Sequence, residues 1–119
     1  MKIGVPSMGE GGLKDQLNQH FGRAPTYTIF DTETKEVEVI QNTSDHMGGV
    51  GVPPELLSKA GVDIMLCSGL GGKAVRLFEE FGIPVFVNAQ GTVRDAISAW
   101  ESGELEEATQ QGSCQEHHH

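Results

Sequence analysis

The chain has 119 residues and a mass of 12.8 kDa, which is the size of one ordinary domain with a single core. Its 17 acidic and 8 basic residues give a formal net charge of -9. Such a field repels phosphate backbones and anionic lipids, so neither nucleic acid nor a membrane is expected as a partner. No apolar run approaches the roughly 20 residues that cross a bilayer, and no signal-peptide core precedes the first strand, so the expected location is the cytoplasm.

The first half of the chain predicts a buried strand, a long loop and a hairpin. The apolar run 2–6 is typical of a short strand, and the polar, glycine-rich stretch 7–20 that follows it is expected to be a loop. Two runs of β-branched and aromatic residues, 26–31 and 36–41, flank the short polar segment 32–35. This arrangement predicts a hairpin.

The second half predicts strands and helices in alternation. Apolar runs at 63–67 and 84–88 are typical of short buried strands. Thr92 and Asp95 have the spacing of a capping box, which marks the start of the last helix. The three expected helices cover 53–60, 74–81 and 93–102, and each is followed by a glycine that can end it.

Five strands and three helices in this order predict an α/β fold with a mixed sheet, in which helical crossovers make the later strands parallel. We expect one domain over residues 1–105. Residues 106–119 are polar and are expected to form a flexible tail, whose three terminal histidines are either native or the remnant of a purification tag. Cys67 falls in an expected buried strand and Cys114 in this tail, so both thiols are expected to stay reduced.

Nearly the whole chain up to Leu105 carries short motifs in a characteristic order. They are Lys2-Ile3-Gly4-Val5-Pro6, His20-Phe21-Gly22-Arg23-Ala24-Pro25, Asp31, the loop 46–51, Gly61-Val62-Asp63, Gly91-Thr92-Val93 and Gly103-Glu104-Leu105. On these motifs the chain resembles the dinitrogenase iron-molybdenum cofactor-binding family, with its NifX-like proteins and the C-terminal domain of NifB. The resemblance implies a ribonuclease-H-like three-layer fold. It also implies binding or carrying of an iron-sulfur or iron-molybdenum-type cluster during cofactor assembly, with proteins as cluster donors and acceptors. For the chain itself we expect a monomer or a weak dimer.

His20 and Arg23 form the first candidate site. By the resemblance, His20 is the motif histidine that meets the cofactor, and a neutral imidazole is a suitable metal ligand. Arg23 could hold an anionic cluster, or its organic acid, through two parallel hydrogen bonds. The alternatives are a plain exposed loop histidine for His20 and, for Arg23, an ion pair with Asp31 or another carboxylate.

A second loop, 42–51, carries His46 next to Met47, with Gly49 close behind. His46 is a candidate metal ligand and Met47 a soft contact for a cofactor, while the glycines would let the main chain approach a bulky inorganic core. The thiol of Cys114 is a further candidate metal ligand. A solvated loop and a tag-bearing tail are the alternatives for these two segments.

The segment Gly69-Leu70-Gly71-Gly72-Lys73 follows an expected strand and opens an expected helix, which is the context of a dinucleotide-binding turn. The acidic partner for a ribose is missing, because the next strand ends in Asn88-Ala89-Gln90. An anion, the cluster included, could still bind at the helix N-terminus. The alternative function is therefore a small nucleotide- or anion-binding regulatory module that uses residues 69–73.

The sequence contains no recognisable catalytic constellation. A nuclease of the ribonuclease-H type needs clustered carboxylates for two metal ions, whereas Asp31, Asp63 and Asp95 fall on separate elements. No Ser, Cys or Thr nucleophile has a base at a recognisable spacing. We therefore expect a non-enzymatic protein that holds its cluster in a cleft between the loop before His20 and the loop around His46.

Overall fold

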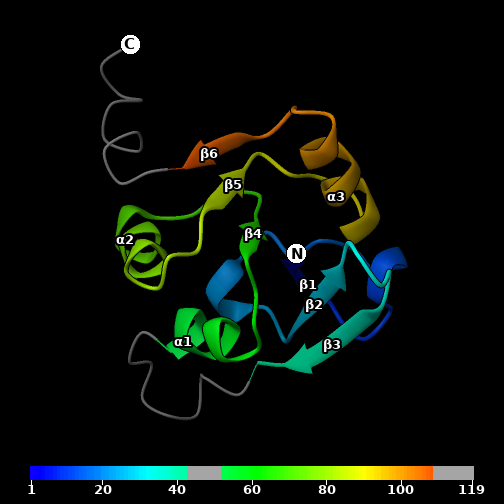
Figure 1. Ribbon diagram of the computed structural model, residues 1–119, viewed down its shortest axis with the longest axis horizontal. Helices are drawn as coiled ribbons and strands as arrows, with labels where there is room; N and C mark the ends of the chain where they lie inside the picture. The colour runs from blue at the N-terminus through cyan, green and yellow to red at the C-terminus, as the bar shows by residue number, and fades with distance from the viewer. Residues whose placement is uncertain (43–51, 109–119) are drawn as a thin grey trace.

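The computed structural model describes residues 1–42 and 52–108, which form a mixed six-stranded sheet with helices on both faces (Figure 1). The strands are β1 (Lys2–Ser7), β2 (Thr26–Asp31), β3 (Val37–Gln41), β4 (Ile64–Leu66), β5 (Val85–Val87) and β6 (Glu106–Ala108). The α-helices are α1 (Val52–Lys59), α2 (Gly72–Glu80) and α3 (Val93–Glu101). Two short 3-10 turns, η1 (Gly12–Lys14) and η2 (Phe21–Arg23), lie between β1 and β2.

The strands are ordered β3-β2-β1-β4-β5-β6 across the sheet. β2 runs antiparallel to both β1 and β3, whereas β4 runs parallel to β1 and to β5. The predicted hairpin and the predicted parallel crossovers are thereby confirmed. Since β1, β4 and β5 point the same way, their carboxyl ends meet at one edge of the sheet. This edge is where open α/β folds place their ligands.

Within the described residues, β6 is the strand that the sequence analysis did not predict, because it placed Glu106–Ala108 in the polar tail. These residues pair antiparallel with β5, with Glu106 opposite Val87 and Ala108 opposite Val85. Two glutamates without an apolar alternation give β6 no local signal, so pairing with β5 determines its conformation. The sheet therefore has six strands and not five, and residues 109–119 lie outside the described ranges.

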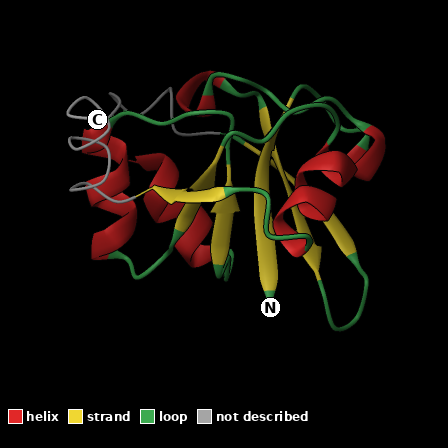
Figure 2. Cartoon of the chain, turned by 90° about the horizontal axis from the view of Figure 1, so that it is seen from above, coloured by secondary structure: helices red, strands yellow, loops and turns green. Residues whose placement is uncertain are grey.

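Two apolar clusters fill the two sides of the sheet. On one side, Leu57 of α1 and Phe78 of α2 pack in a cluster with Tyr27. On the other side, Val93 of α3 packs in a cluster with Ile3. Figure 2 shows the resulting three layers, with the sheet between the pair α1 and α2 and the single helix α3. The predicted α/β three-layer fold is confirmed. No helix in the described ranges is long and apolar enough to cross a membrane.

The start of α3 confirms the predicted capping box. The Asp95 N–H donates to the Thr92 hydroxyl (3.1 Å), and the Thr92 N–H donates to the Asp95 carboxylate (3.0 Å). These two bonds satisfy donors that the first turn of a helix otherwise leaves without partners. The spacing of Thr92 and Asp95 therefore fixes where α3 begins.

Candidate functional site

A pocket of about 600 Å³ opens beyond the carboxyl ends of β1 and β4. One wall is the turn that precedes β2, and the facing wall is the segment that leaves β4 and enters α2. The start of α1 completes it. The pocket is lined by residues 20–23, 53–54, 69–71, 73–74 and 77. Its position is the one that the strand directions of an open α/β sheet favour for a ligand.

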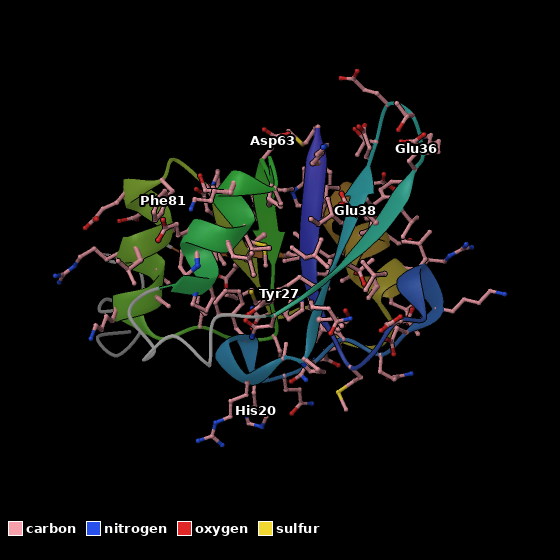
Figure 3. The ribbon with its side chains drawn as sticks, turned by 90° about the horizontal axis from the view of Figure 1, so that it is seen from below. His20, Tyr27, Glu36, Glu38, Asp63 and Phe81 are labelled. Carbon is pink, nitrogen blue, oxygen red and sulfur yellow. The ribbon has the colours of Figure 1, made fainter. Side chains whose placement is uncertain are left out.

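The turn 20–24, which presents His20, is tied to the rest of the molecule by three side chains. The Tyr27 hydroxyl donates to the Phe21 carbonyl (2.9 Å) from inside the core. The Asn42 amide donates to the last carbonyl of the turn (2.8 Å), and the Asn18 side-chain oxygen accepts from its first N–H (2.8 Å). Figure 3 shows His20 projecting outward from this end of the molecule, with Tyr27 in the interior.

The charged and titratable side chains that line the pocket are basic. His20 and Arg23 come from the first wall and Lys73 from the second, and the part of the lining that falls in residues 1–42 and 52–108 contains no carboxylate. All three side chains are exposed, and none forms an ion pair with another described residue. Asp31, considered above as a partner for Arg23, lies at the far end of β2 and accepts hydrogen bonds from the β2–β3 turn. In a chain of net charge -9, the pocket therefore favours an anion.

Glycines lie in both walls of the pocket, next to open space. A Cβ atom added at Gly22, Gly69 or Gly71 would meet no other described atom within 4 Å. Gly71 is also the N-cap of α2 and supplies no side-chain acceptor to the first-turn N–H groups. The positive end of the helix dipole and these N–H groups attract negative charge. The pocket thus fits a bulky anion that carries its own hydrogen-bond acceptors.

The described lining is poor in metal ligands. It offers the imidazole of His20 and no thiolate. Nowhere in residues 1–42 and 52–108 do three or more His, Cys, Asp or Glu side chains gather in a way that could hold a metal ion. A cluster that needs four protein thiolates does not fit this lining. A cluster that arrives with its own sulfides and organic acid, and takes one protein ligand, does fit.

The predicted site residues fall into two groups. The structure places His20 and Arg23 together on one wall of the pocket. His46, Met47, Gly49 and Cys114 lie outside the described residues.

The facing wall was considered as an anion site for the cluster, but it was not predicted to lie opposite His20. Residues 69–73 were expected to bind a nucleotide or an anion, the cluster included, as an alternative to a site at His20, whereas Gly69, Gly71 and Lys73 line the same pocket as His20. The available signal was topological. Both walls follow the carboxyl ends of strands, and neighbouring parallel strands bring such segments together.

Cys67 belongs to the apolar cluster that also contains Phe21, and it is a buried free cysteine. Desolvation by burial raises the pKa of the Cys67 thiol to about 12. At pH 8 the thiolate fraction is therefore roughly 1 in 10⁴, and the thiolate is the reactive form. We expect Cys67 to be inert toward thiol reagents in the folded protein and to react fully once the chain unfolds.

A Cys114→Ser variant makes Cys67 the single thiol, and reagent uptake with and without denaturant then measures its reactivity. Because the folded pKa is raised, burial of the neutral thiol stabilises the fold below the ordinary thiol pKa, and this stabilisation is lost as the pH rises toward about 12. Rapid labelling of the native variant at pH 8 would show that Cys67 is not buried as the structure has it.

Comparisons with known proteins agree with the fold and with the sequence motifs. The family model described as Dinitrogenase iron-molybdenum cofactor matches residues 1–103. An uncharacterized protein of Methanocaldococcus jannaschii is 31% identical over 111 residues, which cover 89% of this chain and 90% of that protein. The apo form of the orange protein from Desulfovibrio gigas is similar in structure, with a TM-score of 0.81 at 27% identity over 90% of this chain and 92% of that chain.

A Thermotoga protein described as a candidate NifB has a TM-score of 0.76 at 34% identity, over 89% of this chain and 91% of that chain. Each of these alignments covers nearly the whole of this chain and nearly the whole of the relative. The similarity therefore concerns the fold as a whole. The match of the family model extends from β1 to the end of α3. The chain belongs to the dinitrogenase iron-molybdenum cofactor family.

Proposed function

We propose that this protein binds an anionic iron-molybdenum-type or iron-sulfur cluster in the pocket and carries it, without chemical conversion, during cofactor assembly. The observation that carries the proposal is the charge of the described pocket lining: Arg23 and Lys73 lie there beside His20, with no carboxylate among the described lining residues, in a chain of net charge -9. Family membership and the similarity to the Thermotoga NifB candidate support the class of cargo.

Each of these side chains has a distinct role in the proposal. The His20 imidazole is the candidate metal ligand that the described lining offers, and it would bind the cluster through a neutral ring nitrogen. Arg23 would hold sulfide or carboxylate atoms of the cargo through two parallel hydrogen bonds. Lys73 and the first turn of α2 would add positive potential from the opposite wall. One metal ligand gives a modest affinity, which suits a carrier that must release its cargo.

Further contacts are proposed from the sequence alone. His46, Met47 and Gly49 would approach the cargo from the segment before α1, and Cys114 would add a thiolate ligand from the C-terminal segment. These four residues lie outside the described ranges, so the experiment below tests this part of the proposal with separate variants. A donor protein would load the cluster and an acceptor protein would receive it.

A second candidate function is binding of a nucleotide or another simple anion at the start of α2. The observation that favours it is the position of Lys73 and of the uncapped first turn of α2 on the pocket wall. A thermal-shift comparison separates the two functions, because a ligand that binds only the folded state raises its apparent stability. Stabilisation by nucleotides and none by the cluster would favour this second function.

The proposed function is tested by anaerobic titration of the full chain with isolated iron-molybdenum cofactor and with a simple iron-sulfur cluster. Residues 117–119 are changed to alanine in every sample, so that terminal imidazoles cannot bind metal. We expect saturable binding that weakens with added salt, because the attraction is electrostatic. Arg23→Ala should reduce the affinity about tenfold, the equivalent of ~1.4 kcal/mol for a charge-assisted hydrogen bond, and His20→Ala by at least as much.

Arg94→Ala is the matched control, because Arg94 is an exposed arginine on α3, which covers the opposite face of the sheet. This variant changes the net charge by the same amount as Arg23→Ala and should bind like the parent chain. Variants of His46, Met47 and Cys114 measure their contributions in the same titration. Equal losses of affinity in the Arg23 and Arg94 variants would mean that net charge, and not the position of Arg23 in the pocket, causes the effect. Absence of saturable binding by the parent chain would contradict the proposal.

A further inference from the structure

The hydroxyl group of Tyr27 is a polar group inside an apolar cluster. Tyr27 is fully buried, and its ring packs on Phe21 with 5.4 Å between the centroids. A phenylalanine would fill the same space without the cost of removing a hydroxyl from water. Packing therefore explains the ring of Tyr27 but not its hydroxyl. The hydroxyl donates to the main-chain carbonyl of Phe21, at 2.9 Å.

The turn that receives this bond has little to hold it in shape by itself. η2 is three residues long, and its own hydrogen bonds run from Arg23 to the His20 carbonyl (3.1 Å) and from Ala24 to the Phe21 carbonyl (3.4 Å). A helical segment this short is not stable alone. Its conformation therefore depends on bonds from outside the turn.

Besides the Asn18 side chain, which accepts from the His20 N–H, outside bonds reach the carbonyls of the turn from two sides. Tyr27 holds the Phe21 carbonyl from the core, while the Asn42 amide donates to the carbonyls of Ala24 (2.8 Å) and Gly22 (3.3 Å) from the end of β3. Three of the turn's carbonyls are thus fixed to the hairpin of β2 and β3. The side chains of the same turn are those that line the pocket.

We propose that Tyr27 is a positioning residue for the pocket: its hydroxyl, with Asn42, fixes the turn so that His20 and Arg23 face the cargo before it arrives. The inference rests on the cluster-binding function proposed above and assigns to Tyr27 a role that its burial alone would not suggest. A preformed turn binds more tightly because the cargo does not have to order it. Tyr27 itself does not touch the cargo.

The test is Tyr27→Phe, which removes the hydroxyl and leaves the ring. The matched control is Thr28→Val, which removes a fully buried hydroxyl from the next residue of the same strand. The Thr28 hydroxyl donates to the Ser7 hydroxyl of β1 (3.0 Å) and not to a carbonyl of the turn. Each variant loses a fully buried hydroxyl and the hydrogen bond named for it here, so a loss of stability that is unrelated to the turn is expected in both.

Two readouts separate a positioning role from a structural one. Hydrogen exchange at the Arg23 and Ala24 amides should accelerate about tenfold in Tyr27→Phe and stay unchanged in Thr28→Val, because one hydrogen bond is worth up to this factor. The affinity for isolated iron-molybdenum cofactor should fall by a similar factor in Tyr27→Phe alone. Asn42→Ala, which acts on the turn from the other side, should reproduce both changes.

The outcomes are distinguishable. If exchange and affinity in Tyr27→Phe match those of Thr28→Val, the positioning role is overturned while the proposed function stands. If the parent chain binds no cluster, the proposed function fails, and the exchange measurement still decides whether Tyr27 holds the turn. Should Tyr27→Phe fold poorly, Asn42→Ala gives the same two readouts.

Discussion

Replacing Phe78 by alanine should lower the free energy of unfolding by about 3–5 kcal/mol, the cost of truncating a buried phenylalanine without refilling its space. Phe78 is fully buried, on the face of α2 that packs against the sheet. Its ring meets the Phe21 ring edge to face, with 5.2 Å between the centroids. The loss is a large share of a typical domain stability of about 5–15 kcal/mol. Urea denaturation should show a lower midpoint at an unchanged slope.

Phe81→Ala is the control for this prediction. Phe81 lies at the end of the same helix, is 42% exposed, and loses the same number of atoms on truncation. The Phe81→Ala variant should lose no more than about 0.5 kcal/mol of its free energy of unfolding, as for other surface substitutions. Similar losses in the two variants would mean that α2 does not dock on the sheet through Phe78. Because Phe78 supports Phe21, its variant should also bind the cluster more weakly, which Phe81→Ala should not.

The contrast between these two phenylalanines shows where sequence reasoning about the fold was limited. Helical spacing groups Phe81 with Leu77 and Phe78 as one apolar face, but the helix ends before Phe81. The residue therefore sits past the turn that docks on the sheet. Local sequence patterns were sufficient where residues within one element set its boundary, as the capping box of Thr92 and Asp95 does for α3. They were insufficient where packing against the sheet determines which side chains are buried.

The same limit explains the missed strand. β6 is an edge strand of three residues, two of them glutamates, and it pairs with β5 alone. An edge strand can be polar because it needs no apolar face against a core, so it leaves no hydrophobic alternation in the sequence. Long-range pairing, which the sequence does not display, is what makes Glu106–Ala108 extended.

For the candidate site, adjacency in the sequence grouped the residues of one wall of the pocket. His20 and Arg23 belong to one motif, and the turn that holds them stays together in the fold. Lys73 and Gly71 reach the same pocket only because β4 lies next to β1 and parallel to it. Periodicity and composition carry no information on which strands are neighbours. The two functional interpretations of the sequence, a cluster site at His20 and an anion site at residues 69–73, therefore describe two walls of one pocket.

Replacing Gly91 by alanine should be the most damaging glycine substitution among those that end or begin helices in the described ranges. Gly91 has a φ of +87°, a conformation that costs an L-residue about 1–2 kcal/mol. An added Cβ atom would also collide with the Asp95 carboxylate, which accepts the Thr92 N–H in the capping box.

Gly103→Ala is the control that isolates the effect of the collision. Gly103 has a φ of +75° but no atom within 4 Å of an added Cβ, so its variant should be destabilised only by the strained backbone conformation. Hydrogen bonds with Thr92 hold the pKa of Asp95 below its ordinary value. The ionised carboxylate therefore stabilises the fold at pH values above the ordinary pKa, and this stabilisation is lost as the pH falls through the lowered pKa of the folded state. In Gly91→Ala the NMR-measured pKa of Asp95 should therefore rise, and the excess loss of stability over Gly103→Ala should shrink in acid. An unchanged Asp95 pKa, with equal losses in both variants, would mean that the carboxylate moves aside without leaving the capping box.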